Sequence, residues 1–153
     1  MNITDYRPVY GGDIIDLVDS MRPDDIKELN AASVMEHCSL IEKSVAESTI
    51  AFSIFINDEL AAIGGVCTTN ILTGHGCPWL LGTVVLDKHK KEILKEAPQA
   101  LSLIKMYNKK LENYVDARNK RAIRVLKWLG FNIERPVLHG PNQMLFHRFT
   151  MGI

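Results

Sequence analysis

The chain has 153 residues, a length that fits one domain and can bury a core large enough to fold without disulfides or a structural metal. Apolar residues make up 46 % of it and charged residues 24 %, as in an ordinary soluble globular protein. Its 18 basic and 18 acidic residues give a formal net charge of zero, which argues against a protein that binds nucleic-acid phosphates over its whole surface. Three cysteines and an N-terminus without a signal-peptide pattern lead us to expect a cytoplasmic protein.

The first third is predicted to contain one short strand followed by three helices. A strand within residues 1–10 ends at a pair of glycines. Asp13 can then cap a helix over residues 13–21. Two further apolar stripes predict helices over residues 23–32 and 36–47, the first with a proline in its first turn.

The middle of the chain changes to the period of a β-strand. A β-rich run at residues 49–56 and its return at 59–67 predict a hairpin, because the Asn-Asp pair between them suits a tight turn. Residues 68–76 are polar and contain glycine, which indicates a loop. The next strand is expected at residues 78–85.

The last part is predicted to alternate helices with strands. In chain order we expect a charged helical run at 87–95, a longer helix from Pro98 to about residue 113, a short strand opening at Tyr114, a helix beginning at Asn119, and two strands at 131–137 and 144–150. Helices between later strands, combined with an antiparallel hairpin, predict a mixed β-sheet with helices on its faces. The fold class is therefore α/β or α+β.

Residues 119–131, NKRAIRVLKWLGF, predict an amphipathic helix with apolar residues on one side and basic residues on the other. Asn119 can cap its N-terminus, and Gly130 can supply the left-handed residue that ends it. An alternative function for the basic face is nucleic-acid binding, with Trp128 available for stacking. One basic helix in a neutral protein is more typical of a solvated surface, so we expect no nucleic-acid partner.

The same segment resembles the C-terminal motif of the GNAT acyltransferase superfamily. The matching residues are Asn119, Ala122, Leu129, Gly130 and Phe131. The order of strands and helices is also similar over most of the chain. The resemblance implies a single GNAT-like domain over residues 1–153, with a central mixed β-sheet flanked by helices on both faces. It further implies an acyl-CoA-dependent N-acyltransferase that moves an acetyl group from acetyl-CoA to an amine.

A narrower resemblance is to small acyltransferase-like proteins encoded by tailed phages, some of them associated with the interior of the virion. It rests on residues 60–65, the strand that carries Trp79, the charged segment 109–114 taken as the end of a helix, and the helix after Asn119. It implies a second hypothesis, a catalytically silent GNAT-like protein that acts in virion assembly or binds a host protein. Its location would be the host cytoplasm or the virion, and its partner would be a protein.

The superfamily resemblance implies that acyl-CoA binds where the sheet splays near Gly82 and Thr83. The expected cofactor-binding residues are Gly82, Thr83 and Val84, through backbone groups, and Asn119, through its side chain. That asparagine is equally suited to capping its helix, and one side chain can serve both purposes. The usual glycine-rich phosphate loop is missing, because residues 86–99 contain no glycine.

The resemblance also implies where proton transfer would occur. The superfamily often has a tyrosine seven residues after the asparagine to protonate the leaving thiolate, but that position is Leu126 here, which cannot donate a proton. Tyr114 is the expected substitute acid, with Tyr107 as an alternative. Asp116 is the expected base acting through water, with Asp87 as an alternative. The expected mechanism is direct transfer, accelerated by positioning and by N–H donors aimed at the oxyanion.

Two further groups of residues give weaker evidence for a functional site. Cys67, His75 and Cys77 offer three metal ligands, but their spacing matches no standard zinc pattern, so we expect no metal. Cys77 is also a candidate nucleophile with His75 as its base, although a turn before a strand explains both residues equally well.

Overall fold

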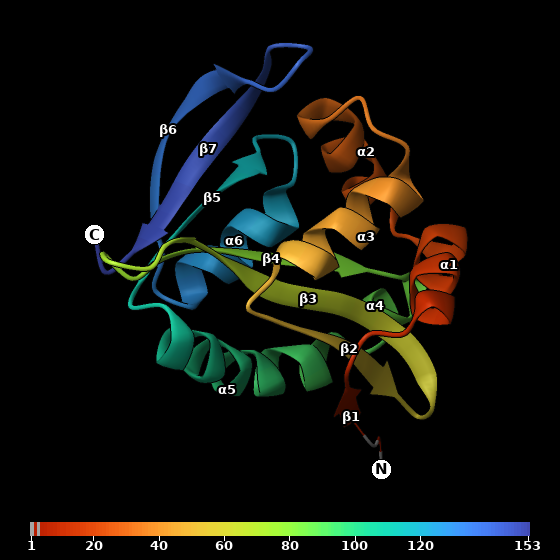
Figure 1. Cartoon of the computed structure of the whole chain (residues 1–153). Helices are drawn as coiled ribbons and strands as arrows, with labels where there is room; N and C mark the ends of the chain where they lie inside the picture. The colour runs from red at the N-terminus through yellow and green to blue at the C-terminus, as the bar shows by residue number, and fades with distance from the viewer. Residues whose placement is uncertain (1, 3) are drawn as a thin grey trace.

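The computed structural model describes Asn2 and residues 4–153 as a seven-stranded β-sheet with helices on both faces (Figure 1). The strands are β1 (Thr4–Arg7), β2 (Ile50–Ile56), β3 (Glu59–Asn70), β4 (His75–Gly82), β5 (Lys110–Asp116), β6 (Asn132–His139) and β7 (Met144–Met151). The helices are α1 (Gly11–Ser20), α2 (Pro23–Ala32), α3 (His37–Glu47), α4 (Val84–Lys88), α5 (Lys90–Tyr107) and α6 (Lys120–Trp128).

The strand order across the sheet is β1-β2-β3-β4-β5-β7-β6. All neighbouring strands are antiparallel except β4 and β5, which are parallel. The predicted mixed sheet with flanking helices is therefore confirmed. Among the residues that the structure describes, no helix is long and apolar enough to span a membrane.

The two faces of the sheet build separate apolar cores. Successive residues of β3 point to opposite faces, so Ile63 packs against α1 and α3 whereas Ala62 packs against α4. Leu17 of α1 and Ile41 of α3 are fully buried on the first face. Figure 1 shows α1 and α3 on one side of the sheet and α5 on the other. A third cluster joins α5 and α6 to β5 through buried Leu111 and its neighbours.

The hairpin of β2 and β3 forms as predicted. Asn57 and Asp58 both have positive φ, 52° and 65°, as a tight two-residue hairpin turn requires. The pairing runs from Ile56 opposite Glu59 back to Ile50 opposite Val66. The predicted loop at residues 68–76 is shorter than expected, because β3 continues to Asn70 and β4 begins at His75.

One predicted helix boundary is wrong. The helix expected to reach residue 113 ends at Tyr107, and most of the segment 109–114 lies in β5. Asn108, which is 1 % exposed, explains the break. Its side-chain amide donates to Thr68 Oγ1 over 3.2 Å and so anchors the end of α5 to β3. This tertiary contact outweighs the helical propensity of the lysines that follow.

The strand predicted to reach residue 85 ends at Gly82. Thr83 causes this ending, because its hydroxyl accepts the backbone N–H of Val85 over 3.2 Å and caps α4. The same hydroxyl donates to the carbonyl of Leu60 over 2.7 Å. Val84 therefore lies in a helix and not in a strand. The predicted restart at Pro98 is also wrong, because α5 begins at Lys90 and contains the proline.

The sheet opens between β4 and β5. These strands pair only near their N-terminal ends, at His75 with Lys110 and at Gly76 with Leu111. Beyond that point they diverge toward Gly82 and Asp116 (Figure 1). Asn113 of β5 crosses the narrow end of the gap, where its Nδ2 donates to the carbonyl of Pro78 over 2.8 Å. The splay implied by the resemblance is therefore present.

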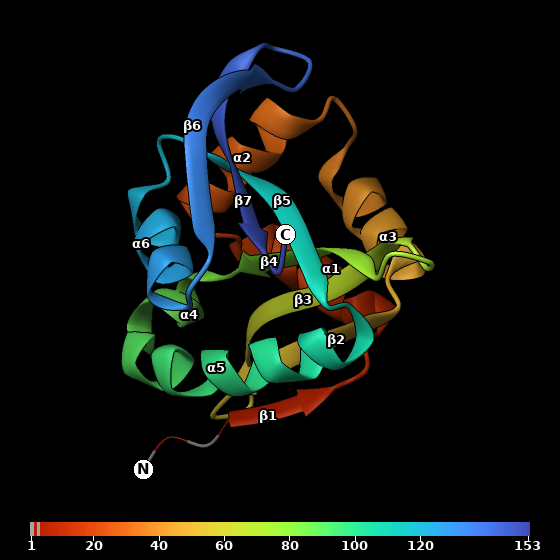
Figure 2. The same cartoon turned by 90° about the vertical axis from the view of Figure 1, so that its left-hand side faces the viewer.

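Helix α2 crosses this opening. Figure 2 shows the β6–β7 hairpin projecting beyond the rest of the sheet, with its turn beside α2. Asn142 of that turn donates to the carbonyl of Asn30 over 3.5 Å, and a Cβ on Gly140 would lie 2.3 Å from the carbonyl oxygen of Ala31. At its other end, the N–H of Arg22 donates to the carbonyl of Gly82 over 2.9 Å. Helix α2 is thus held at both ends, by β4 and by the hairpin.

Candidate active site

Two backbone N–H groups mark the sides of the opening, and both are bonded to carboxylates from α2. Gly82 at the end of β4 donates to Asp25 Oδ2 over 2.7 Å. Asp116 at the end of β5 donates to Glu28 Oε1, also over 2.7 Å. The two carboxylates are three residues apart on one helix and therefore lie on the same face. We call Asp25 and Glu28 the α2 carboxylate pair.

The space beside Gly82 is occupied by two side chains of the chain itself. A Cβ at this position would be 2.8 Å from Arg22 Nε and 2.5 Å from a methyl carbon of Leu86. The Arg22 guanidinium is seated against the strand and forms an ion pair of 3.0 Å with Asp25. The glycine predicted to contact a cofactor therefore provides room for an arginine of the chain itself.

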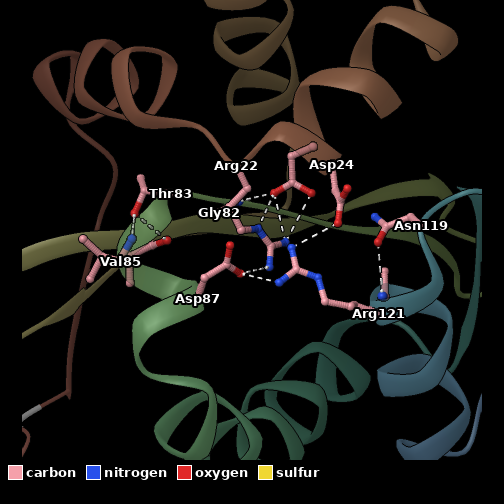
Figure 3. Close-up of polar contacts among 11 residues, drawn as sticks. Arg22, Asp24, Gly82, Thr83, Val85, Asp87, Asn119 and Arg121 are labelled. Carbon is pink, nitrogen blue, oxygen red and sulfur yellow. Dashed lines mark hydrogen bonds and ion pairs between the residues drawn. The ribbon is translucent and has the colours of Figure 1, made fainter.

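An ion-pair network ties α2, α4 and α6 together around the opening (Figure 3). Asp87 of α4 lies between two arginines, 3.4 Å from Arg22 and 3.2 Å from Arg121. Arg121 of α6 also pairs with Asp24 of α2 over 3.0 Å. Arg121 is about 40 % exposed, so each of its pairs contributes well under about 1 kcal/mol to stability.

Both members of the α2 carboxylate pair resist ionisation. Burial raises the pKa of Asp25, although Arg22 and the Gly82 N–H act in the opposite direction. Burial also raises the pKa of Glu28 to about 7, reinforced by the nearby charges of Asp25 and Asp116. The two carboxylates are therefore held in the opening by specific donors while their charged forms are poorly solvated.

Thr83 and Val84, two of the expected cofactor-binding residues, continue from Gly82 along the same side of the opening. The Thr83 backbone N–H is already bonded to the carbonyl of Ala61 over 2.9 Å, and its hydroxyl caps α4. Val84, at the first position of α4, is 44 % exposed. Thr83 is thus engaged in ending β4, and Val84 offers an accessible side chain beside it.

Asn119, the fourth expected cofactor-binding residue, caps α6 as predicted. Its Oδ1 accepts the N–H of Ala122 over 3.2 Å, and the residue is 6 % exposed. Gly130, with φ of 100°, follows the other end of the helix, which confirms the second predicted cap. The Asn119 side chain also lies close enough to Glu28 to lower the pKa of that carboxyl, so the cap residue faces the opening.

Asp116 and Tyr114, the expected catalytic residues, share one face of β5 because they are two positions apart. Burial alone would raise the pKa of the Asp116 carboxyl, but hydrogen bonds and an ion pair of 2.7 Å from Arg118 hold that pKa below its usual value. The Tyr114 ring stacks on His139, with ring centroids 3.9 Å apart. Asp116 is thus next to Asn119 and Glu28, whereas Tyr114 is engaged with β6.

Little space remains beside α2. A cavity of about 40 Å³ is lined by Asp24, Lys27, Asp116, Arg118 and Asn119, which is room for about one water molecule. A larger hollow of about 310 Å³ lies at the start of α5 and shares only Asp87 with the ion-pair network. In this arrangement the opening does not fit the arm of an acyl-CoA, because its two backbone donors are bonded and the volume is filled.

Solved structures provide a comparison, whereas neither a protein-family model nor a curated protein sequence matches the chain. Spermidine N-acetyltransferase from Vibrio cholerae, in complex with CoA and spermine, matches with a TM-score of 0.70 and 13 % identity, over 97 % of this chain and 94 % of that one. Aminoglycoside acetyltransferase AAC(6')-Ib in complex with coenzyme A gives a TM-score of 0.70 and 16 % identity, with the same coverage. A GNAT-family acetyltransferase from Streptococcus pneumoniae gives 0.64 and 14 %, over 97 % and 98 %.

The chain has the GNAT fold. At identities of 13 to 16 % the likeness concerns the path of the backbone, and the side chains of the opening are described from this protein alone. Those side chains distinguish it: an acidic helix lies in the opening of its GNAT fold, and an arginine covers the end of β4.

The residues that fill the opening of this GNAT fold were missed by sequence reasoning. Arg22, Asp25 and Glu28 were read only as the start of a helix. The available signal was the three-residue spacing of Asp25 and Glu28, which puts two acids on one helical face. Nothing local indicates that this face meets Gly82 and Asp116, which are 57 and 88 positions away.

The structure also shows where the candidate metal ligands and the candidate cysteine nucleophile lie. Cys67 and Cys77 lie directly opposite each other on β3 and β4. Burial raises the pKa of the Cys77 thiol to about 11, which makes it a poor nucleophile at neutral pH. The His75 ring bonds the hydroxyl of Thr73 over 2.6 Å. Within Asn2 and residues 4–153, no group of three or more His, Cys, Asp or Glu side chains is arranged to hold a metal ion.

Proposed function

We propose that this protein is an acyl-CoA-dependent N-acyltransferase-like protein that transfers an acetyl group to an amine. The observation that carries the proposal is the parting of β4 and β5, with backbone N–H groups at both sides of the gap, in the fold of acetyltransferases solved with CoA. One of those structures contains spermine, a polyamine, which makes amines the acceptor class to test. The proposal treats residues 1–153 as one GNAT-like domain.

Within this proposal each expected site residue has a defined task. Gly82, Thr83 and Val84 present the backbone of β4 and α4 to the cofactor, and Asn119 presents its amide from the opposite side. Asp116 is the candidate base because it lines the same small cavity as Asn119 and is ionised at neutral pH; its lowered pKa makes it a weak base, so most of the rate would come from positioning. Tyr114 is the candidate acid because it shares the face of β5 with Asp116.

The direct test is thermal unfolding with and without acetyl-CoA. A ligand that binds only the folded state adds about 2.7 kcal/mol at a hundred times its dissociation constant, which is an easily measured shift. We expect a shift with acetyl-CoA, followed by acetylation of an amine from a panel that includes polyamines. Asn119→Ser keeps an oxygen that can cap α6 but loses the amide, so it separates a cofactor contact from a capping role.

Absence of a shift at millimolar acetyl-CoA, both in the folded wild-type protein and in folded variants of the carboxylates bonded to Gly82 and Asp116, would contradict this proposal. It would favour a second candidate, a catalytically silent GNAT-fold protein that binds a protein partner. The observation that favours it is that α2 occupies the opening with its own carboxylates. The lack of glycine in residues 86–99 and the leucine at position 126 point the same way.

The second candidate has its own experiment. The likeness to phage-encoded proteins makes virion assembly or binding of a host protein its specific form, with the host cytoplasm or the virion as its location. We would measure whether the purified chain copurifies with a stoichiometric protein partner after expression in the presence of phage structural proteins. A specific complex without any acetyl-CoA shift supports the silent candidate, and a shift without a complex supports the enzyme.

A further inference from the structure

The opening of the sheet is closed by the chain itself. Asp25 accepts the N–H of Gly82 and Glu28 accepts the N–H of Asp116, each over 2.7 Å. Each bond joins a carboxylate to a backbone donor, a type that is shorter and stronger than a neutral hydrogen bond. The two donors belong to different strands, so α2 binds both sides of the gap at once.

The geometry points to an autoinhibitory role for the α2 carboxylate pair: Asp25 and Glu28 occupy the backbone donors that the carbonyl groups of an acyl-CoA arm would use, and α2 must withdraw before cofactor binds. This inference rests on the proposed acyltransferase-like function and explains why the opening does not fit acyl-CoA as it stands. It assigns to α2 a competitive role that neither the fold nor its relatives specify.

The contacts that keep α2 in place are of a kind that can release. Arg121 holds Asp24 and Asp87 through partly exposed pairs, which are individually weak. The contact of Asn142 with the carbonyl of Asn30 is long, at 3.5 Å. Apolar burial by α2 is modest, since Ile26 and Leu29 are partly buried in the cluster of α1 and α3 and the small side chain of Ala31 is 4 % exposed. Elements with few buried apolar contacts are the ones that open locally.

The ligand class follows from the chemistry of the donors and of the surrounding arginines. Backbone N–H groups bind carbonyl oxygens as well as carboxylates, so the amide and thioester carbonyls of an acyl-pantetheine arm can replace the α2 carboxylate pair. Withdrawal of α2 also frees Arg22 from Asp25, leaving it and Arg121 near the end of β4. The two guanidinium groups still share Asp87, and the loss of Asp25 and Asp24 as partners makes them available to attract the cofactor phosphates.

The test is the affinity for acetyl-CoA measured by isothermal titration calorimetry. Asp25→Asn combined with Glu28→Gln keeps the shape and the acceptor oxygens of both side chains but replaces charged acceptors with neutral ones. We expect this double variant to bind acetyl-CoA roughly tenfold tighter than wild type, and each single variant to gain severalfold. Glu28→Gln alone is the gentler variant if the double variant proves unstable, and circular dichroism verifies that each one is folded.

The matched control is Asp19→Asn. It removes the same charge from an exposed position near the end of α1, away from both backbone donors of the opening and from the contacts that hold α2. We expect it to change the affinity less than Asp25→Asn. Equal gains from both variants would show that only charge matters and would overturn the inference.

The remaining outcomes separate the inference from the proposed function. Tight binding by wild type, unchanged in the double variant, would overturn the inference and leave the acyltransferase proposal intact. No binding by wild type or by any folded variant would overturn both. Weak wild-type binding that tightens in the double variant supports both.

Discussion

The two sides of β4 are built in different ways. Toward β3 it is paired at eight register positions, from Asn70 opposite His75 to Ala62 opposite Gly82. Toward β5 it is paired at two. The first boundary is a continuous backbone ladder, whereas the second is closed by side chains of Asn113, Asp25 and Glu28. We therefore expect β4 to be held rigidly against β3 and to separate more easily from β5.

The largest effect is expected in the continuous part of the sheet. Gly65 pairs with β4 on one side and with β2 on the other, and a Cβ there would lie 2.4 Å from the backbone oxygen of Ile50. Because a backbone atom cannot move aside cheaply, we expect Gly65→Ala to lower the free energy of unfolding by about 3 kcal/mol, the upper end of the usual cost of overpacking. Urea denaturation measures the loss.

The control for this variant is Gly12→Ala in the first turn of α1. A Cβ on Gly12 meets nothing within 4 Å, so the substitution should be neutral or slightly stabilising, by about 0.5 kcal/mol. Similar behaviour of the two variants would show that the close approach at Gly65 is not a constraint.

The next effect is a pH dependence caused by Glu28. Its carboxyl faces Asp25 of its own helix, Asp116 of β5 and the amide of Asn119, and burial raises its pKa from 4.5 to about 7. A raised carboxyl pKa adds stability that is complete below about pH 4.5 and is lost as the pH rises through about 7. Between pH 5 and pH 8 the loss corresponds to about 2 to 3 kcal/mol.

The measurement is urea denaturation of wild type and Glu28→Gln at pH 5 and pH 8. Wild type should lose more stability than the variant between these two values. The carboxyls of Asp13 and Asp116 have lowered pKa values, so their contributions change below about pH 4, and the pKa of Asp25, raised by burial, is present in both proteins, so the difference between them reports Glu28. Identical pH slopes for the two proteins would contradict a perturbed Glu28.

A smaller effect is expected where a single side chain joins β4 to β5. Asn113→Ala removes the hydrogen bond to the carbonyl of Pro78 and should cost about 1 kcal/mol. It should also speed hydrogen exchange of amides near the narrow end of the gap. The exposed Asn132 of β6 is the matched control, and equal effects of the two alanine variants would deny Asn113 a bridging role.

The smallest effect is expected at Arg121. Arg121→Ala breaks ion pairs with Asp24 and Asp87, but the side chain is partly exposed, so the loss should be below about 1 kcal/mol. Thermal unfolding at low and high salt provides the check, because the difference from wild type should shrink as salt screens the pairs. A large loss that is independent of salt would mean that Arg121 acts through packing.

The contrast between the two sides of β4 also explains what the sequence could predict. The β2–β3 hairpin and the caps of α6 were predicted correctly because their signals are local: an Asn-Asp turn between alternating residues, and an asparagine and a glycine at the ends of an amphipathic stripe. The mixed sheet with flanking helices followed from the order of such elements. The GNAT resemblance then located the splay near Gly82.

The contents of the splay could not be predicted in the same way. The bonds that fill it join residues 57 and 88 positions apart, and they depend on the path of α2 across the sheet. The prediction of where α5 ends was wrong for a similar reason, because Asn108 is hydrogen-bonded to Thr68, 40 positions earlier. Helix and strand propensities depend on residues that are close in the sequence, whereas these contacts join residues that are close only in the folded structure.

Gly82 has no side chain and so leaves space for the guanidinium of Arg22, a residue 60 positions away in the chain. A methyl group at position 82 would press on two side chains, Arg22 and Leu86, and both would have to move. Replacing Arg22 with a smaller residue removes one of these two contacts, so Gly82→Ala should cost less in that background than in wild type. In a mutational library of this protein, positions 22 and 82 should therefore show epistasis, with alanine at position 82 found more often beside a small residue at position 22.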